Sequence, residues 1–384
     1  MKRTALAVLA LLICLSSFAQ QALGRGSRIV SPQINKDNSV TFRLVAPKAV
    51  RVHVAGDFLP AEGVDPKEVP TFAEMTEKNG VWEYTTKPLA SELYSYSFIV
   101  DGLKILDPSN VYINRDVAST MNIFIVGGGC GDYYKVNDVP HGTVSKVWYD
   151  SPTLNLTRRM TVYTPAGYDK NKKQKYPVFY LLHGAGGDEE AWMDLGRTSQ
   201  ILDNLIAQGK AEPMIVVMPY ANPYPEMMLR GLADRYDSMD TKLTTEEFTK
   251  SVVPFIEANY NVRTDADSRA IAGFSLGGRQ TLACGLGNPD MFHYVCAFAP
   301  AIFGPEIGAN FTNGTYADAA KINDSLKLVW LSCGTSDFLY QSSLALEKQF
   351  NERGIEHKTM YPGGGHTWMN CRDYLIEVAK LLFK

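Results

Sequence analysis

The front part of the chain alternates apolar and polar residues with a period of two. Val40, Phe42 and Leu44 show this alternation, with polar or charged residues between them. Such a pattern is typical of strands that bury one face. The same alternation recurs at Val50, Val52 and Val54, and at Tyr94, Tyr96 and Phe98. It predicts a series of short strands between residues 40 and 126.

A two-residue turn supports the strand prediction. Asp101-Gly102 separates the runs 94–100 and 103–106, and this dipeptide favours the tight turn of a β-hairpin. About a hundred residues of short strands and regular turns predict a β-sandwich of immunoglobulin type over residues 28–126. Three glycines then open a short linker, which we place at residues 127–139.

The pattern changes after residue 140. Short apolar runs predict the strands of a mainly parallel sheet that is buried on both faces: Val178–Leu182, 215–218, 270–272 and Leu328–Ser332. Amphipathic stretches between them predict helices over 245–259 and 342–353, the second of which ends at Gly354. Alternating strands and helices predict a doubly wound α/β domain over residues 140–384.

Residues 1–22 have the pattern of an export signal. Two basic residues precede an apolar run over residues 5–15, and small residues follow at Ser17 and Ala19. The run is too short for a good membrane span. We expect cleavage after Ala19 or Ala22, which predicts a secreted or periplasmic protein without a membrane span in the mature chain.

Two alternatives concern attachment to a membrane. In the first alternative, residues 5–15 are not removed and anchor the chain in a membrane. In the other, Cys14 carries a lipid, although Ile13 stands where a lipoprotein signal has a small residue.

Composition limits the partners of the chain. The 384 residues carry 38 Lys and Arg against 41 Asp and Glu, a net charge of −3, and 45% are hydrophobic. This is the composition of an ordinary globular protein. Because no cluster of basic residues stands out, the electrostatic footprint of a nucleic-acid-binding protein is missing.

The histidines and cysteines show no metal-binding spacing. The six histidines are scattered, and the sequence has neither H-E-x-x-H nor C-x-x-C. We therefore expect no metal and no cofactor. Five cysteines remain after residue 22, an odd number, so the disulfide pairing stays open.

One pentapeptide predicts the chemistry of the second domain. Residues 273–277 read Gly-Phe-Ser-Leu-Gly, directly after the predicted strand 270–272 and before a helical stretch. In this setting G-x-S-x-G is a nucleophile elbow, a strained turn that projects the serine hydroxyl from the sheet of an α/β hydrolase fold. Ser275 is the predicted nucleophile. The alternative is an ordinary serine in a tight turn.

A serine nucleophile needs a base that is oriented by an acid. In the α/β hydrolase fold the acid and then the base follow the serine along the chain. Asp337 lies just after the predicted strand Leu328–Ser332 and is the predicted acid, with a capping role as its alternative. His366 follows three glycines, whereas His357 falls within a strand-like run. His366 is therefore the predicted base.

The tetrahedral intermediate of acyl transfer needs backbone N–H donors. Leu276, which follows the serine, is predicted to supply one donor. The loop 183–187, His-Gly-Ala-Gly-Gly, is predicted to supply the other. The sequence leaves open whether Gly184 or Ala185 donates. We expect His183 to shape this loop and not to act as a second base.

The motifs together resemble carbohydrate esterase family 1, the esterase D-type enzymes that include feruloyl and acetylxylan esterases. The resemblance rests on residues 180–187 with Trp192 downstream, 272–278, 334–337 and 364–368. The front module resembles the family 48 carbohydrate-binding module, an early-set immunoglobulin-like fold, at residues 40–54, 56–58, 80–82 and 94–102. The resemblance implies a serine esterase that acts on plant hemicellulose.

Three aromatic residues are expected to bind substrate: Trp192, Tyr224 and Trp368. The two tryptophans belong to the segments that resemble the esterases. Tyr224 lies in the segment 220–239, which is rich in Tyr and Met. This segment is either a lid over an aromatic acyl group or a surface loop that packs its own apolar side chains.

The aromatic residues of the front module have two interpretations. Trp82, Tyr94 and Tyr96 are candidates for a platform that stacks on sugars. Tyr94 and Tyr96 alternate along one face of a predicted strand, however, and such residues usually fill the core of a sandwich. We favour the core, and whether the module binds glycan stays open.

The leading hypothesis is a secreted serine esterase that removes feruloyl or acetyl groups from hemicellulose such as xylan through an acyl-enzyme. The alternatives are an enterochelin-type siderophore esterase, a sugar acyltransferase and a non-catalytic glycan-binding protein. The export signal weighs against the first, and the intact set of Ser275, Asp337 and His366 weighs against the last. Because these residues all follow Val139, we expect the front module to serve access to the polymer more than chemistry.

Overall fold

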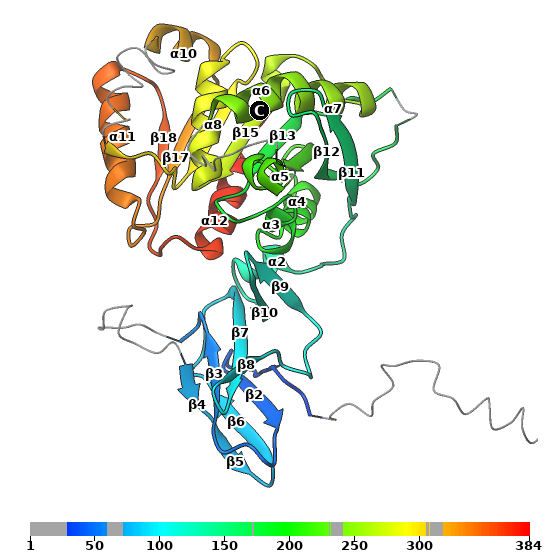
Figure 1. Cartoon of the computed structure of the whole chain (residues 1–384), viewed down its shortest axis with the longest axis vertical. Coiled ribbons are helices and arrows are strands. Elements are labelled where there is room, and N and C mark those ends of the chain that lie inside the picture. The colour runs from blue at the N-terminus through cyan, green and yellow to red at the C-terminus, as the bar shows by residue number, and fades with distance from the viewer. Residues whose placement is uncertain are drawn as a thin grey trace, which may run out of the picture. The chain divides into compact units, whose positions relative to one another are not determined.

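The computed structural model describes residues 29–59, 72–170, 173–229, 231, 241–304, 307 and 318–384 (Figure 1). The predicted export signal at residues 1–22 lies outside them. The chain divides into two compact units. The smaller unit contains residues 1–90, 94–113 and 120–126, and the larger unit contains 91–93, 114–119 and 127–384.

The front of the chain forms two β-sheets. One has the order β1 (Gln33–Ile34), β2 (Val40–Val45), β6 (Val81–Thr85) and β5 (Thr76–Lys78). The other has the order β4 (Phe72–Glu74), β3 (Val52–Gly56), β7 (Glu92–Val100), β10 (Ser119–Val126) and β9 (Ile113–Asp116), and β8 (Leu103–Ile105) pairs with β7. The ring of Phe42 on β2 lies 4.8 Å from that of Tyr96 on β7, so the two sheets share an aromatic core. This is the predicted β-sandwich.

The core interpretation of the front aromatic residues is confirmed. Tyr94 and Tyr96 are buried, and Trp82 is buried with its indole N–H donating to the carbonyl oxygen of Ala46 at 3.0 Å. None of the three presents a free ring face to a sugar. Val50 is the exception to the predicted strand pattern, because it precedes β3 and is exposed.

The larger unit is built on an eight-stranded sheet within the described residues. Its order is β11 (Thr143–Ser151), β12 (Leu156–Thr164), β14 (Ile215–Pro219), β13 (Val178–Leu182), β15 (Arg269–Phe274), β16 (Tyr294–Phe298), β17 (Leu328–Ser332) and β18 (Lys358–Met360). The strands from β14 to β18 are parallel, and β11 and β12 add an antiparallel hairpin at one edge. The predicted parallel strands are confirmed, whereas the hairpin has no counterpart in the sequence prediction.

Helices cover both faces of this sheet (Figure 1). Their bounds are α2 Gly131–Tyr134, α3 Ala191–Asp194, α4 Thr198–Ala207, α5 Tyr224–Leu229, α6 Lys242–Glu247, α7 Val253–Asn259, α8 Leu276–Gly287, α10 Ala319–Ser325, α11 Tyr340–Arg353 and α12 Trp368–Ala379. A π-helical turn, Phe248–Val252, joins α6 to α7, so the predicted helix 245–259 is one continuous segment. The cap predicted after α11 is present, since Gly354 has a φ of 69°.

The two faces of the sheet pack against different helices. Val178, Tyr180 and Leu182 share a buried cluster with side chains of α7, α8 and α11. On the other face, Phe298 of β16 packs against Trp192 of α3 and Tyr374 of α12. A sheet buried on both faces explains why its strands are continuous apolar runs.

The strand register brings the functional loops together. Leu182 of β13 pairs with Gly273 of β15, Gly273 pairs with Ala297, and Ala297 pairs with Leu331 of β17. The carboxyl ends of these parallel strands are therefore level, and the loops that follow them meet at one edge of the sheet. Ligand sites of open α/β sheets lie at this edge.

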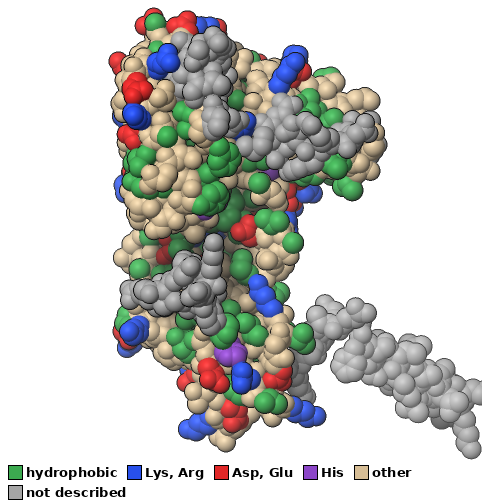
Figure 2. Space-filling model, turned by 60° about the vertical axis from the view of Figure 1, so that its left-hand side comes forward, with side chains coloured by type: hydrophobic (Ala, Val, Ile, Leu, Met, Phe, Trp, Pro, Cys, Tyr) green, Lys and Arg blue, Asp and Glu red, His purple; other side chains and the backbone are tan. Residues whose placement is uncertain are grey.

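The surface agrees with the near-neutral composition. Figure 2 shows Lys and Arg side chains interspersed with Asp and Glu side chains over the described part of one face. Among the described helices, none is long and apolar enough to cross a membrane. The five cysteines from Cys130 onward are free thiols, and four of them are buried.

Candidate active site

Ser275 occupies a strained turn between β15 and α8. Its φ is 58° and its ψ is −114°, a positive-φ conformation outside the left-handed helical region that is rare for residues other than glycine. The flanking glycines are required by space. A Cβ on Gly273 would overlap the carbonyl oxygen of Gly277, and a Cβ on Gly277 would come within 2.6 Å of the carbonyl oxygens of His183 and Leu182. The G-x-S-x-G pattern is thus explained by backbone packed against backbone.

The elbow is fixed by hydrogen bonds to the neighbouring strand. The N–H of Ser275 donates to the carbonyl oxygen of Phe298 at 2.9 Å, and its own carbonyl oxygen accepts the N–H of Ala301 at 2.9 Å. Leu276 begins α8, a helix of 12 residues, so the positive end of the helix dipole lies beside the serine. This field stabilises negative charge that develops next to Ser275.

Asp337 and His366 form a hydrogen-bonded pair. Nδ1 of His366 lies 2.7 Å from Oδ2 of Asp337. The side chain of Asp337 is only 1% exposed, whereas that of His366 is 22% exposed. The other carboxylate oxygen of Asp337 accepts the N–H of Leu339 at 2.8 Å. The carboxylate is therefore buried and satisfied, and the imidazole keeps access to the surface.

The imidazole lies beside the elbow. Its ring centroid is 4.3 Å from that of Phe274, the residue immediately before Ser275. The structure thus places the Asp337–His366 pair against the residue that precedes the predicted nucleophile, at the carboxyl edge of the sheet.

The loops that carry the acid and the base are joined by backbone hydrogen bonds. Thr335 N–H donates to the carbonyl oxygen of Pro362 at 2.9 Å, and Ser336 N–H donates to that of Gly364 at 2.9 Å. The side chain of Asn370 also donates to the carbonyl oxygen of Gly363 at 2.8 Å. The geometry of the Asp–His pair is therefore set before any substrate binds.

His357, the competing base, lies at the wrong end of its strand. It precedes β18, whose direction is parallel to that of its neighbour β17, so it belongs to the edge opposite the elbow. Its Nδ1 donates to the carbonyl oxygen of Ile355 at 2.7 Å, and its ring packs on Phe350. These contacts give His357 a structural role.

The loop after β13 approaches the serine closely. A Cβ on Gly184 would lie 3.3 Å from Cβ of Ser275, which leaves little space for a side chain. The next residue, Ala185, is exposed. Gly184 thus stands next to the elbow, in the loop predicted to supply an oxyanion donor, and Ala185 follows it at the surface.

His183 is held neutral beneath this loop. Its Nδ1 donates to the carbonyl oxygen of Gly184 at 2.8 Å, and its Nε2 accepts the N–H of Ala221 at 3.0 Å. Burial lowers the pKa of His183 to about 4, because the charged ring cannot be hydrated there. The contacts agree with the loop-shaping role predicted for this histidine.

The expected substrate-binding residues differ in their exposure. The prediction for Trp192 needs correction, because its side chain is 1% exposed and its indole N–H donates to the carbonyl oxygen of Leu182 at 2.8 Å. Trp192 instead supports Trp368, whose ring is 5.2 Å away, half-buried, and also in contact with Phe274. Tyr224 begins α5 and is half-buried. Much of the segment 220–239 lies outside the described residues.

Phe338 is a site residue that the sequence prediction missed. It directly follows Asp337, its side chain is 72% exposed, and its ring lies 4.7 Å from that of His366. Phe303 is also exposed, two residues after Ala301, whose N–H bonds to Ser275. Large exposed apolar side chains beside polar catalytic groups are typical of binding surfaces. The feature that identifies Phe338 as a site residue is the exposure of its side chain, which cannot be read from the sequence.

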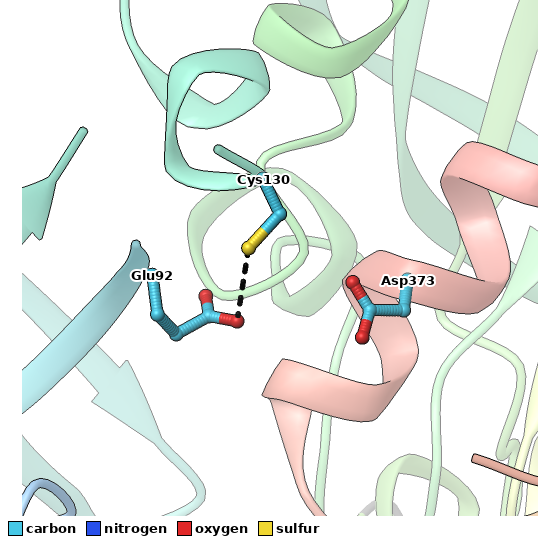
Figure 3. Close-up of side chains that lie close together, drawn as sticks. All are labelled: Glu92, Cys130 and Asp373. Atoms are coloured by element: carbon cyan, nitrogen blue, oxygen red, sulfur yellow. Dashed lines mark hydrogen bonds between the residues drawn. The ribbon is translucent and has the colours of Figure 1, made fainter. Parts of the chain in front are cut away.

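Figure 3 shows a second cluster of titratable groups, whose residues belong to the larger unit. Ligand atoms of Glu92, Cys130 and Asp373 lie within 4.8 Å of one another. Glu92, however, accepts a hydrogen bond from the buried Arg372 at 2.9 Å. The thiol of Cys130 donates to the carbonyl oxygen of Ser91, and burial raises its pKa, which disfavours the thiolate that a metal binds. We interpret the cluster as a structural link between residues 91–93 and α12.

The fold is that of an α/β hydrolase, and sequence comparison places the chain among the esterases. The family model Esterase matches residues 151–381, and the chain belongs to this family. The model of carbohydrate-binding module 48, the isoamylase N-terminal domain, matches residues 30–113.

Similar proteins cover different shares of the chain. An endo-1,4-beta-xylanase/feruloyl esterase of Xylanibacter ruminicola is 29% identical over 92% of the chain and 46% of its own length. The structure of a CE1 ferulic acid esterase from Anaeromyces mucronatus, solved with ferulic acid, matches with a TM-score of 0.56 and 27% identity over 65% of the chain and 93% of its own. The enterobactin esterase of Shigella flexneri shares the fold over 90% of the chain and 94% of its own, with a TM-score of 0.64 and 18% identity. The chain spans less than half the length of the curated relatives it matches.

Proposed function

We propose that the protein hydrolyses feruloyl or other hydroxycinnamoyl esters on plant hemicellulose such as xylan, with acetyl esters as the second choice. The observation that carries the esterase chemistry is the buried Asp337 paired with His366, whose ring packs against Phe274 next to Ser275. The relatives named feruloyl esterase support the substrate class.

The chemistry follows from the positions of these groups. Nδ1–H of His366 donates to Asp337, which leaves Nε2 to accept the proton of the Ser275 hydroxyl. The serine oxygen attacks the ester carbonyl, and the N–H of Leu276 with that of Gly184 or Ala185 stabilises the oxyanion. The intermediate collapses to an acyl-enzyme as the bond between the acyl carbon and the sugar oxygen breaks and His366 gives its proton to that departing oxygen. Water, activated by the same imidazole, then releases the acid.

An aromatic acyl group suits the surface around His366. Phe338 presents an exposed ring there, and Phe303 lies on the loop that bonds to Ser275. A hydroxycinnamoyl group is flat and apolar, so it gains from stacking on such rings. An acetyl group would leave the same surface uncovered.

The front unit and the leader complete the proposal. The chain acts outside the cytoplasm after residues 1–22 are removed, and the unit that resembles carbohydrate-binding module 48 brings the enzyme to the polymer. The match to that family supports this role, and the similarity to an endo-1,4-beta-xylanase/feruloyl esterase extends over 92% of the chain.

A substrate panel tests the function. Purified protein and its Ser275→Ala variant are assayed on methyl ferulate, acetylated xylan, feruloylated arabinoxylan and enterobactin. Release of ferulate from methyl ferulate and arabinoxylan by the unaltered protein alone is the expected result. Activity confined to acetylated xylan reassigns the acyl group, and activity confined to enterobactin replaces the proposal with a siderophore esterase.

A further inference from the structure

The oxyanion loop of the larger unit touches a turn from far upstream in the chain. This turn joins β9 to β10, and its residues 114–119 belong to the larger unit. Val117 lies at the turn and packs against Gly186, since a Cβ on Gly186 would be 3.1 Å from both γ-carbons of Val117. Gly186 is exposed and has a φ of 75°, so the loop has little packing of its own at this point.

Polar contacts extend this junction on either side of Val117. Arg115 Nη2 forms an ion pair with Asp188, directly after the oxyanion loop, and Arg115 Nη1 donates to the carbonyl oxygen of Val117 at 2.9 Å. The buried Asn114 donates through Nδ2 to the carbonyl oxygen of Asp194 at 3.0 Å. The turn therefore contacts Gly186 within the oxyanion loop and also Asp188 and Asp194, which follow the loop along the chain.

The backbone of Val117 is strained. Its φ is 52°, and a β-branched residue is a true outlier in this conformation. Other described residues with positive φ include Asn79, Asp101 and Asn155, whose side chains favour the left-handed conformation, and also Arg197, Ala299 and Phe383, but Val117 is the β-branched one among them. Strain of this kind persists where surrounding structure imposes it, and it points to a function of the side chain.

We propose that the 114–118 turn positions the oxyanion loop, with Val117 and Arg115 as positioning residues for ester hydrolysis. Oxyanion donors are effective because they are in place before negative charge develops. Gly184 and Ala185 lie in a glycine-rich loop, so contact with the turn restricts the positions that their N–H groups can adopt. The inference rests on the proposed esterase function and on the oxyanion role of this loop.

The first test removes the side chain and relieves the strain in the full-length protein. Val117→Gly is expected to lower kcat on methyl ferulate by about tenfold or more, with KM within about twofold of the original. Its thermal unfolding midpoint should be unchanged or higher, because glycine accepts the backbone conformation. Val117→Ile keeps both γ-carbons and should retain kcat. Asn155→Gly, at a turn with a φ of 53° between β11 and β12, is the matched control and should leave kcat unchanged.

The second test breaks the ion pair. Arg115→Met removes the bond to Asp188 and the bond to the Val117 carbonyl, and it should also lower kcat more than it changes KM. Lys321→Met removes a comparable exposed pair with Asp290, remote from the loop, and should have no effect on kcat. If Val117→Gly lowers the thermal unfolding midpoint, Arg115→Met becomes the variant that tests whether the turn positions the oxyanion loop.

An inhibitor distinguishes positioning from a general structural effect. Phenylboronic acid forms a tetrahedral adduct with a catalytic serine and mimics the transition state. Its inhibition constant should rise in Val117→Gly and Arg115→Met in parallel with the loss of kcat/KM, whereas inhibition by ferulate should change little. Unchanged kcat in both variants, or unchanged boronate affinity despite lower kcat, overturns the inference. An unaltered protein without activity on any ester would instead contradict the proposed function.

Discussion

Oδ2 of Asp337 lies 2.7 Å from Nδ1 of His366, and the carboxylate is almost fully buried while the imidazole is partly exposed. A buried carboxylate without a partner would be strongly destabilising, so the pair holds one tautomer of the histidine. In that tautomer Nδ1 carries the proton, and Nε2 is the nitrogen that can accept a proton.

Asp337→Asn should lower kcat by several orders of magnitude with a much smaller change in KM. The amide can donate to Nδ1 and so favours the tautomer whose Nε2 carries a proton and cannot accept one from Ser275. The loss therefore falls on the transition state and not on substrate binding. Steady-state kinetics on methyl ferulate measures both constants. His366→Ala should show the same pattern, and His357→Ala is the matched control. A larger loss from His357→Ala than from His366→Ala would show that the base is misassigned.

Ser275→Ala should abolish turnover without loss of the fold. The substitution deletes only the hydroxyl, and its backbone hydrogen bonds to Phe298 and Ala301 remain available. Activity on methyl ferulate and the thermal unfolding midpoint are measured together. Ser336→Ala, at an exposed serine beside the acid, should keep full activity. Residual activity above about one hundredth of the original would reject Ser275 as nucleophile.

Phe338→Ala should change the choice of acyl group. Loss of the exposed ring beside His366 removes a stacking surface for a hydroxycinnamoyl group but touches little of an acetyl group. We expect KM for methyl ferulate to rise about three- to tenfold, with kcat/KM for p-nitrophenyl acetate nearly unchanged. The acetate ester thus serves as the control within the same variant. Equal losses on both esters would mean that Phe338 orients His366 and does not bind the acyl group.

The sequence was sufficient for the alternating front strands, for four of the parallel strands, for the turn at Ser275 and for the Asp337–His366 pair, and the reason is physical. Period-two and continuous apolar patterns report burial directly, and in parallel strands the loops after their carboxyl ends meet at one edge. Ser275, Asp337 and His366 each follow or flank such strands, so their order along the chain was enough to predict that they lie at one edge of the sheet.

Other features depend on contacts between residues distant in sequence. Trp192 matched a family segment, but its burial depends on the packing of α3 against β16. The exposure of Phe338 is likewise a property of the folded surface. The contact of Val117 with Gly186 could not be predicted, because no periodicity relates a turn between two front strands to a loop about seventy residues later. Residues from Val139 onward therefore contain the predicted triad and oxyanion segments but not this turn.

The last prediction concerns the cluster around Asp373. Burial raises the pKa of this carboxyl to about 6, and the negative charge of Glu92 adds to the effect while Arg372 opposes it. The folded protein therefore holds a proton on Asp373 more tightly than the unfolded chain does, between about pH 4 and pH 6. The contribution of this proton to the free energy of unfolding is fully present below pH 3.8 and is lost as the pH rises through about 6.

Asp373→Asn should consequently stabilise the protein at pH 7 to 8, because the amide avoids the cost of a buried charge and can still accept a hydrogen bond from Tyr134. The gain is on the order of 1 to 3 kcal/mol, since one pKa unit corresponds to about 1.4 kcal/mol. Denaturant unfolding of both proteins from pH 4 to pH 8 should show the difference shrinking below pH 6 and vanishing near pH 4. Asp290→Asn, at an exposed carboxylate paired with Lys321, should show no such gain at neutral pH. A variant less stable than the original at pH 7 would mean that the Asp373 carboxylate is stabilised where it lies, and that the Tyr134 hydroxyl and Arg372 outweigh its burial.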